Sequence, residues 1–594
     1  MIREKSLVVY KNRPALVIET GEKISISVLG GEQVRVREKD IDMIHPGPCA
    51  LSGLEQDIPS GDARFAWELL EGSPVTLREL AELVYGEYTA KSAWSAYLLL
   101  KDRLYFSGEL TAIQGRSSEE VILEEQKRAE KRQDREERNA FLERLKSQSL
   151  QLPDDGRFLQ DVDALGYGKT DKSRTLRDLG KPETPQEAHR LLLNTGFWTP
   201  QINPHPARFG LSLFSAKIPV SPPSRDEERL DLTHLHAFAI DNAWSSDPDD
   251  AISVEGNHIW VHVADPAAVI TPGSPADIEA RGRGATLYLP EGAARMIAEE
   301  ALPFFALGLE ETSPALSFKI ALNEDLSIEK TEIVRSRVKV TRLTYEEADA
   351  LIGAGNVLSA GDTQAYIPEL TRLHILAERN FERRLNAGAV SIELPEVHIA
   401  VSGGQVTVEP LAGHRSADMV RECMLLAGEG AARWALQRRL PFPYISQEIG
   451  DIPNVPLDGM AGSFQLRRCM RPRTLSVKPG IHWGLGLDEY TQVTSPLRRY
   501  TDLLAHQQIR AFLRNEPPLQ EEEVILRLAA GEAAASTVMQ AERASRAHWT
   551  AVYLSDKKGI PWDGVMLEKR GGRGVVMIPA LGLETQAAIK KDLE

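Results

Sequence analysis

Cysteine and long hydrophobic runs are both scarce in this 594-residue chain. Its three cysteines, Cys49, Cys423 and Cys469, lie far apart and form no CxxC pair, so the sequence supports neither a disulfide framework nor a cysteine-ligated zinc site. No run of about 18 apolar residues is available to cross a bilayer, and the N-terminus lacks the apolar core of a signal peptide. We therefore expect a soluble, cytoplasmic protein with no membrane partner.

Positive charge is also in short supply, because 86 acidic residues outnumber 70 lysines and arginines and give a net charge of -16. This excess of negative charge disfavours a protein that coats DNA without specificity. It leaves room for a nucleic-acid enzyme with local basic surface, and arginines cluster at 437–440, 467–473 and 497–500. The chain is too long for one hydrophobic core, so we expect several domains.

The N-terminal part of the sequence predicts two small domains. Residues 1–50 alternate apolar and polar positions between turn residues, which is typical of a small β-barrel-like unit. Residues 58–115 contain three short helical patterns followed by a hairpin pattern, and these predict a winged helix-turn-helix. A packing or protein-binding module is an equally good interpretation, because the expected third helix, 90–100, carries Lys91 as its only basic residue.

The remainder is predicted to contain a connector, a large domain and a short C-terminal barrel. Residues 116–225 read as a helical connector, in which the charge-mixed run 119–146 predicts a solvated, salt-bridged helix; a nucleic-acid role is less favoured there because the charges nearly cancel. Residues 226–555 mix strand and helix patterns, and 556–594 follow as a separate β segment. The expected fold class is multidomain α+β.

The segment from 240 to 252, IDNAWSSDPDDAI, concentrates negative charge. It holds four aspartates within ten residues, namely Asp241, Asp247, Asp249 and Asp250. Pro248 disfavours a continuous helix, so the carboxylates can converge on one loop. Like charges at this density repel one another, and a divalent cation or a basic partner would relieve the repulsion. Because the available ligands are oxygens, the pattern favours Mg²⁺, with Mn²⁺ as a second candidate, over zinc.

This acidic run has two other interpretations. A calcium loop of the EF-hand type requires Gly at its sixth position and Glu at its twelfth, and counting from Asp247 these positions are Ile252 and His258. A solvated acidic turn is the commonest alternative, although the apolar residues on both sides indicate a loop held between buried segments. A cation held by aspartates, with arginines nearby, is an arrangement that can catalyse phosphodiester hydrolysis.

Six ordered motifs now resemble one family. They are FAIDNAWSSDPDDAISV, VHVADPAAVI, ATLYLPEG, LTYEEAD, MVRECMLLAGEGA and GLGLDEYTQVTSPLRRYTDLLAHQQI. Together they are similar to the RNB catalytic domain of the ribonuclease II and ribonuclease R family. The resemblance implies metal-dependent, processive 3′-to-5′ hydrolysis of RNA that releases nucleoside 5′-monophosphates.

The resemblance also implies roles for the residues of the acidic loop and of the SPLRRY motif. Asp241 and Asp250 match direct Mg²⁺ ligands, and Asp247 matches a catalytic residue that is either a ligand or an outer-shell partner. Asp249 matches a catalytic residue that holds the 3′ end or the attacking water. Arg498 matches the arginine that contacts the scissile phosphate.

The resemblance also implies residues that bind RNA. Tyr288 matches an aromatic residue that stacks on the terminal nucleotide, although the residues alone favour a buried tyrosine. Glu422 matches an acidic residue near the 3′-terminal nucleotide, but Arg421 stands where relatives often have a second acid. Arg499 is expected to bind substrate or to support the fold.

At 388–397, where some relatives place a clamping phenylalanine, the candidates Val390 and Ile392 are unable to stack.

The two ends depart from the typical family pattern. Two N-terminal cold-shock barrels are replaced by the β unit, the helix-turn-helix-like region and the charged helix, which resembles a cyanobacterial and plastid-like branch. The C-terminal segment resembles the first strands of an S-type OB barrel, but only 33 residues run from Trp562 to Glu594. We expect a partial OB-fold whose phosphate contacts are Lys569, Arg570 and Arg573.

The sequence allows two functions for this protein. The leading hypothesis is an exoribonuclease that acts on the 3′ end of single-stranded RNA and that we expect to be a monomer. The rival is a nucleic-acid-binding regulator in which the helix-turn-helix binds and the catalytic domain is degenerate. The presence of all four aspartates and Arg498 favours the enzyme. Whether structured RNA is degraded stays open.

Overall fold

The computed structural model describes residues 2–54, 59–70, 73–354, 365–452 and 457–588. The chain divides into two compact units, Met1–Phe158 and Leu159–Glu594. Each unit has its own hydrophobic core. Among the described helices, none combines the length and the apolar character needed to cross a bilayer.

The first unit begins with a five-stranded antiparallel sheet in the order β4-β3-β2-β1-β5. Alternation of buried and more exposed side chains is clearest in β3, as a strand with one face on a core requires. This confirms the predicted N-terminal β unit. The strands are β1 (Leu7–Tyr10), β2 (Arg13–Glu19), β3 (Ile24–Val28), β4 (Gln33–Val36) and β5 (Asp42–His45).

A winged helix-turn-helix follows the sheet, as predicted. Capping boxes formed by Thr76 with Glu79 and by Thr89 with Ser92 fix the starts of its second and third helices. The wing is an antiparallel hairpin. The elements are α1 (Ala63–Leu69), α2 (Leu77–Tyr85), α3 (Ala90–Asp102), β6 (Phe106–Glu109) and β7 (Ala112–Gly115).

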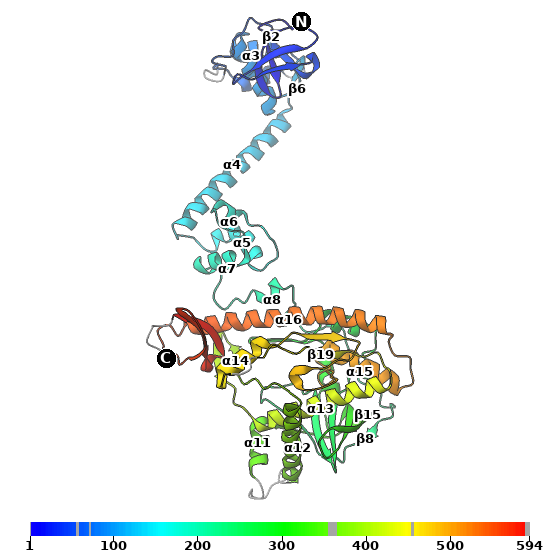
Figure 1. The fold of residues 1–594 in the computed structure, drawn as a ribbon. Helices are drawn as coiled ribbons and strands as arrows, with labels where there is room; N and C mark the ends of the chain where they lie inside the picture. The colour runs from blue at the N-terminus through cyan, green and yellow to red at the C-terminus, as the bar shows by residue number, and fades with distance from the viewer. Residues whose placement is uncertain (1, 55–58, 71–72, 355–364, 453–456, 589–594) are drawn as a thin grey trace. The chain divides into compact units, whose positions relative to one another are not determined.

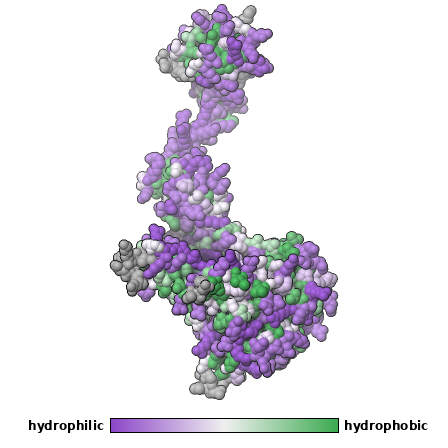
Figure 2. All heavy atoms as spheres, viewed as in Figure 1, coloured by the Kyte–Doolittle hydropathy of each residue, from purple (hydrophilic) through white to green (hydrophobic). Residues whose placement is uncertain are grey.

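Helix α4 (Ser118–Lys146) corresponds to the charge-mixed run. Most of its side chains are exposed, and hydrophilic residues cover it in Figure 2. Ion pairs such as Arg128 with Glu124 and Arg128 with Asp102 lie along it. The predicted solvated, salt-bridged helix is therefore present.

The second unit opens with short helices and continues into a seven-stranded sheet. The sheet order is β16-β9-β10-β11-β14-β15-β8, antiparallel except for the β15–β8 and β16–β9 pairs. The short helices are α5 (Gln160–Gly166), α6 (Arg174–Asp178), α7 (Pro185–Asn194) and α8 (His205–Arg208). The strands are β8 (Leu230–Asp231), β9 (Ala237–Asp241), β10 (Asp250–Glu255), β11 (His258–Ala264), β14 (Ser313–Leu322), β15 (Ile328–Val338) and β16 (Val340–Thr344).

Helices cover this sheet and complete the main core. Apolar residues of β9, β10, β11 and β14 pack against α11 (Tyr345–Ala354), α12 (Ile367–Asn386) and α13 (Arg415–Gln437). Two more helices, α15 (Tyr500–Leu513) and the 35-residue α16 (Glu521–Ser555), follow in the chain. Helix α16 is the long orange helix of Figure 1.

Smaller elements surround the core. They are α9 (Pro275–Arg283), β12 (Leu287–Leu289), β13 (Gly292–Ala294), α10 (Leu302–Phe305), β17 (Val397–Ser402), β18 (Gln405–Pro410), β19 (Tyr444–Gln447), α14 (Gly459–Cys469) and β20 (Arg473–Ser476). The described C-terminal residues form one antiparallel sheet of β21 (Val565–Arg570), β22 (Arg573–Ile578) and β23 (Leu583–Ala588), in keeping with a partial barrel.

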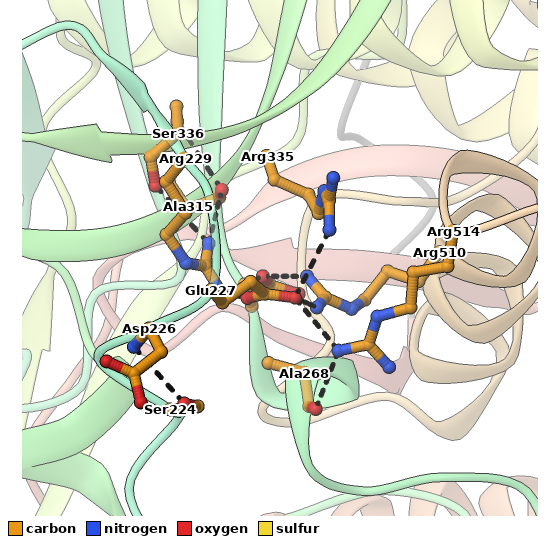
Figure 3. Close-up of polar contacts among 11 residues, drawn as sticks. Ser224, Asp226, Glu227, Arg229, Ala268, Ala315, Arg335, Ser336, Arg510 and Arg514 are labelled. Carbon is orange, nitrogen blue, oxygen red and sulfur yellow. Dashed lines mark hydrogen bonds and ion pairs between the residues drawn. The ribbon is translucent and has the colours of Figure 1, made fainter.

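A buried ion-pair network links the segment before β8 to the C-terminal half of α15. Glu227 lies among four arginine side chains in Figure 3, with an Oε1 to Arg514 Nη2 distance of 2.9 Å and further ion pairs to Arg229, Arg335 and Arg510. Asp265 accepts from Arg510 at 2.5 Å and from Arg229 at 2.8 Å. Arg510 is 2% exposed, so its buried charge depends on the carboxylates of Glu227 and Asp265 for compensation.

Candidate active site

The acidic loop connects two adjacent antiparallel strands of the central sheet. Asp241 is the last residue of β9 and Asp250 is the first of β10. Because neighbouring antiparallel strands bring such ends to the same sheet edge, the two aspartates lie together although eight residues separate them. Ile240 and Ile252 on either side are buried in the main core. The interpretation as a solvated acidic turn is therefore wrong.

Asp249 makes the contact that joins this loop to the SPLRRY motif. Its Oδ1 accepts a hydrogen bond from the backbone N–H of Leu497 at 2.9 Å, and its Oδ2 accepts one from Arg498 Nε at 3.1 Å. Asp249 is only 5% exposed. Burial raises the pKa of Asp249 to about 7, although the charge of Arg498 opposes the rise.

Asp241 and Asp250 form no ion pair within the part of the chain that the structure describes. Burial raises the pKa of Asp250 to about 6; Arg498 opposes this rise and the negative charge of Asp241 adds to it. Two neighbouring carboxylates without a cationic partner make a strongly negative point at the sheet edge. Their oxygens suit Mg²⁺, which typically takes one or two protein carboxylates and completes its shell with water and substrate phosphate.

Asp247 departs from the predicted metal set. Its side chain forms an ion pair with Arg295, which follows β13, instead of joining Asp241 and Asp250. Among the described residues no group of three or more His, Cys, Asp or Glu side chains is placed to hold a metal ion. The geometry therefore fits a site with two protein carboxylates, in which Asp247 pairs with Arg295; its role as a ligand or an outer-shell partner stays a prediction.

Two cavities meet at these residues, and both are lined by Asp241, Asp249, Asp250 and Arg498. The smaller, of 290 Å³, is named the α13 cavity because Ala417, Val420, Arg421, Met424 and Leu425 of that helix form one wall. The larger, of 590 Å³, is named the Tyr288 cavity and is also lined by Trp244, Arg295, His398 and Arg546. The acidic cluster thus lies between a small and a large chamber.

The Tyr288 cavity has two half-exposed aromatic residues. Tyr288, in β12, is 42% exposed, so it is not the buried tyrosine that its neighbours in sequence favoured. Trp244, in the acidic loop itself, is 52% exposed and stacks on His398 with ring centroids 4.1 Å apart. Both aromatic rings therefore offer exposed surface to the same cavity.

Sequence reasoning missed Trp244, His398, Arg295 and Arg546. For Trp244 the signal was present, because a large aromatic residue stands among the aspartates in a loop. The other three reach the cavity from distant segments, and nothing in their local sequence indicates it.

The predicted Arg499 lies at the α13 cavity and also supports the fold. Its Nη2 donates to Asp502 Oδ1 at 2.7 Å, and that carboxylate accepts the backbone N–H of Ser495 at 2.8 Å. Arg499 therefore holds the turn that presents Arg498.

Glu422 is placed differently from the prediction. It is 2% exposed, accepts from Arg384 Nε and from Asn380 Nδ2, each at 2.9 Å, and does not line either cavity. Its neighbour Arg421 lines the α13 cavity instead. One residue along a helix rotates the side chain by about 100°, so Glu422 points into the core and is a structural residue.

Lys569, Arg570 and Arg573 lie on β21 and β22 of the C-terminal sheet. Arg570 pairs with Glu568 at 2.8 Å. None of the three lines either cavity at the acidic cluster. Their predicted phosphate contacts would therefore be made away from the site of hydrolysis.

Family comparisons agree with this architecture. The RNB domain model matches residues 229–456 and 458–515, which contain the acidic loop and Arg498. The model described as the ribonuclease II winged helix domain matches 57–120, and a double HTH domain model matches 121–204. The fold and the site thus define an RNB-domain ribonuclease with an N-terminal helix-turn-helix region.

Relatives identify the family. An uncharacterized ribonuclease of Synechocystis is 31% identical over 90% of this chain and 85% of its own length. The chloroplastic and mitochondrial ribonuclease II of Arabidopsis thaliana is 32% identical over 76% of this chain and 62% of its own length. The chain belongs to the ribonuclease II and ribonuclease R family of 3′-to-5′ exoribonucleases, and these matches agree with the cyanobacterial and plastid-like resemblance.

A solved structure shares the fold. Ribonuclease R of Mycoplasma genitalium, in complex with ribose-methylated single-stranded RNA, matches with a TM-score of 0.57 and 18% identity. The match covers 64% of this chain and 68% of that one.

Proposed function

We propose that this exoribonuclease is metal-dependent and processive, binds single-stranded RNA by its 3′ end and releases nucleoside 5′-monophosphates. The observation that carries the proposal is the contact of Asp249 with Arg498 beside the unpaired carboxylates of Asp241 and Asp250. In this arrangement the carboxylates that can bind a cation lie beside the arginine that can bind a phosphate. The RNA-bound ribonuclease R of Mycoplasma genitalium supports RNA as the substrate.

In this proposal Asp241 and Asp250 hold Mg²⁺, which Mn²⁺ can replace. The cation would supply activation of water and neutralisation of the phosphate. Arg498, held by Asp249, binds the non-bridging oxygens of the scissile phosphate and stabilises the charge that develops on them. The Asp249 carboxylate, with a pKa of about 7, is suited to accept a proton from the attacking water near neutral pH.

The Tyr288 cavity accounts for binding without strong sequence preference. Tyr288 and Trp244 offer aromatic faces on which any base can stack, and Arg295 and Arg546 add positive charge for the backbone. Because Arg295 pairs with Asp247, that aspartate acts by holding a phosphate-binding arginine rather than by binding the cation.

The rival function is a nucleic-acid-binding regulator with a degenerate catalytic domain. A degenerate domain is expected to lose one of the acidic or basic groups, whereas here Asp241, Asp249, Asp250 and Arg498 all line shared cavities. The assembled set favours the enzyme.

The test is degradation of 5′-labelled single-stranded RNA with and without Mg²⁺. Wild type with Mg²⁺ should release mononucleotides from the 3′ end, and Asp249→Asn should lose about 10²- to 10³-fold in kcat. Asp325→Asn, an exposed aspartate in the β14–β15 turn, is the matched control and should retain wild-type activity. Wild-type protein that yields no mononucleotides would contradict the proposal.

A DNA strand of the same sequence tests the preference for ribose. If the enzyme reads 2′-hydroxyl groups, DNA should be degraded much more slowly than RNA. Equal rates on both strands would remove RNA specificity from the proposal.

A further inference from the structure

Helix α13 presents a single charged residue to the small cavity beside the acidic cluster. The helix residues that line it, Ala417, Val420, Arg421, Met424 and Leu425, follow the spacing i, i+3, i+4, i+7, i+8 of one helical face. Four of these five side chains are uncharged, so Arg421 is the exception in an otherwise apolar wall. An arginine on the apolar face of a helix, beside a catalytic site, is expected to have a role that depends on its positive charge.

The arginines of the cavity differ in the carboxylates that hold them. Its lining contains three aspartates and three arginines, namely Asp241, Asp249, Asp250, Arg421, Arg498 and Arg499. Arg498 pairs with Asp249 and Arg499 pairs with Asp502, and both of these carboxylates are buried. Arg421 pairs with Asp418, whose side chain is exposed. Arg421 is therefore the arginine of this cavity that is most readily available to a further anion.

Arg421 is free to exchange its present partner. Its side chain is 56% exposed, and Nη1 pairs with Asp418 Oδ1 at 2.9 Å, where the aspartate side chain is 63% exposed. Exposed pairs of this kind are weak. The other carboxylate nearby, Glu422, lies 3.9 Å from Arg421 Nε and is committed to Arg384. A guanidinium group with weak partners is well suited to bidentate binding of phosphate.

The sizes of the two cavities indicate which part of the RNA substrate each cavity binds. The α13 cavity, of 290 Å³, is half the size of the 590 Å³ Tyr288 cavity, and both open on the same catalytic residues. A strand cleaved one nucleotide from its end places one nucleotide on one side of the scissile phosphate and the remaining strand on the other. The smaller cavity therefore suits the terminal nucleotide, which differs from the expectation that this nucleotide stacks on Tyr288 in the larger cavity.

Building on the proposed function, we propose that Arg421 binds a phosphate on the 3′ oxygen of the terminal nucleotide, so that the enzyme degrades RNA ending in a 3′-phosphate. Water attacks the scissile phosphorus, and the bond from phosphorus to the 3′ oxygen of the preceding nucleotide breaks. That oxygen leaves as a new 3′-hydroxyl after taking a proton. The terminal 3′-phosphate is untouched, so the first product is a nucleoside 3′,5′-bisphosphate.

The test uses two 5′-labelled RNAs of one sequence, ending in a 3′-hydroxyl or a 3′-phosphate. Wild type should degrade both and release the bisphosphate first from the second, as mass spectrometry of the product would detect. Arg421→Glu should lower kcat/KM on the 3′-phosphate RNA about tenfold or more beyond its effect on the 3′-hydroxyl RNA. Arg421→Lys should recover part of the difference, and Arg415→Glu, an exposed arginine at the start of α13, should behave as wild type.

The outcomes separate this inference from the function on which it rests. If wild type degrades the 3′-hydroxyl RNA but stops at the 3′-phosphate, the role of Arg421 is wrong while the exoribonuclease proposal stands. If Arg421→Glu and Arg415→Glu change the ratio of the two substrates equally, recognition by Arg421 is also wrong. If the 3′-hydroxyl RNA is not degraded at all, the proposed function itself fails.

Discussion

Two clusters of charged side chains in the second unit are built from the same elements and differ in their balance of charge. The catalytic cluster and the buried network both use the β10–β11 region and the segment around helix α15. Asp250 begins β10 and Asp265 follows β11, while Arg498 precedes α15 and Arg510 lies within it. In the network, burial raises the pKa of Glu227, but hydrogen bonds and charges from its arginines outweigh burial and hold that pKa below the usual value.

In the catalytic cluster the balance is reversed. Three aspartates share one arginine, and the pKa values of Asp249 and Asp250 rise to about 7 and about 6. The several arginines around Glu227 and Asp265 make the network stabilising. In the catalytic cluster Asp241 and Asp250 have no ion-pair partner among the described residues, which leaves negative charge for a cation. The comparison predicts that removing an arginine lowers mainly stability at the network and mainly activity at the catalytic cluster.

The largest effect on stability is expected at the network. Arg510→Met would leave Glu227 and Asp265 buried with one cation fewer, and should cost about 3–5 kcal/mol. The fall in the urea or thermal midpoint measures this loss. Arg190→Met, at an arginine whose side chain is 68% exposed, is the control and should cost less than about 1 kcal/mol. Equal losses in the two variants would contradict the importance of the network.

At the catalytic cluster the loss of an arginine should appear in activity. Arg498→Met should lower kcat about 10²- to 10³-fold because the developing phosphate charge loses its donor. Stability should fall less than in Arg510→Met, since Arg498 is 46% exposed and Asp249 can take up a proton when it loses its partner. Measuring kcat and the thermal midpoint on the same preparation checks both parts. A larger fall in midpoint than that of Arg510→Met would remove the distinction.

The pH dependence of stability tests the carboxylates of Asp249 and Asp250. Their pKa values in the folded chain, about 7 and about 6, exceed the unfolded value of about 3.9. The folded state therefore binds more protons than the unfolded state, and without a divalent cation stability should fall as pH rises from about 4 to about 7.

Asp250→Asn should remove part of this fall, by up to about 3 kcal/mol at pH 8. Thermal midpoints in EDTA from pH 4 to pH 8 measure it, and added Mg²⁺ should reduce the difference between variant and wild type. Parallel curves for the two proteins would show that Asp250 contributes no such cost.

The smallest effect concerns RNA binding beside the cluster. Trp244→Ala should weaken binding of single-stranded RNA by about 1–3 kcal/mol, because one stacking face is lost. Equilibrium binding to the Asp249→Asn background avoids degradation during the measurement. Phe214→Ala is the control, since Phe214 is 72% exposed and lines neither cavity. If both variants bind equally well, Trp244 is not a stacking residue.

Much of the fold was predictable because it follows from local patterns. Alternating side chains gave the N-terminal sheet, helical spacing and caps gave the winged helix and α4, and six motifs gave the RNB domain. The convergence of Asp241 and Asp250 was also predictable in outline, since two strands flank a short loop. The C-terminal residues Lys569, Arg570 and Arg573 were assigned to strands correctly in kind, although their contact with RNA stays a prediction.

The sequence by itself determined the chemical groups of the site and the helices and strands that carry them, because periodicity, caps and motif order act over a few residues. Only the tertiary structure decided the partners. Asp249 contacts Arg498, which lies 249 residues away in the chain. Asp247 pairs with Arg295, and Glu422 points into the core, where it pairs with Arg384. The physical reason is that a charge pair depends on distance in space, and long-range packing sets that distance.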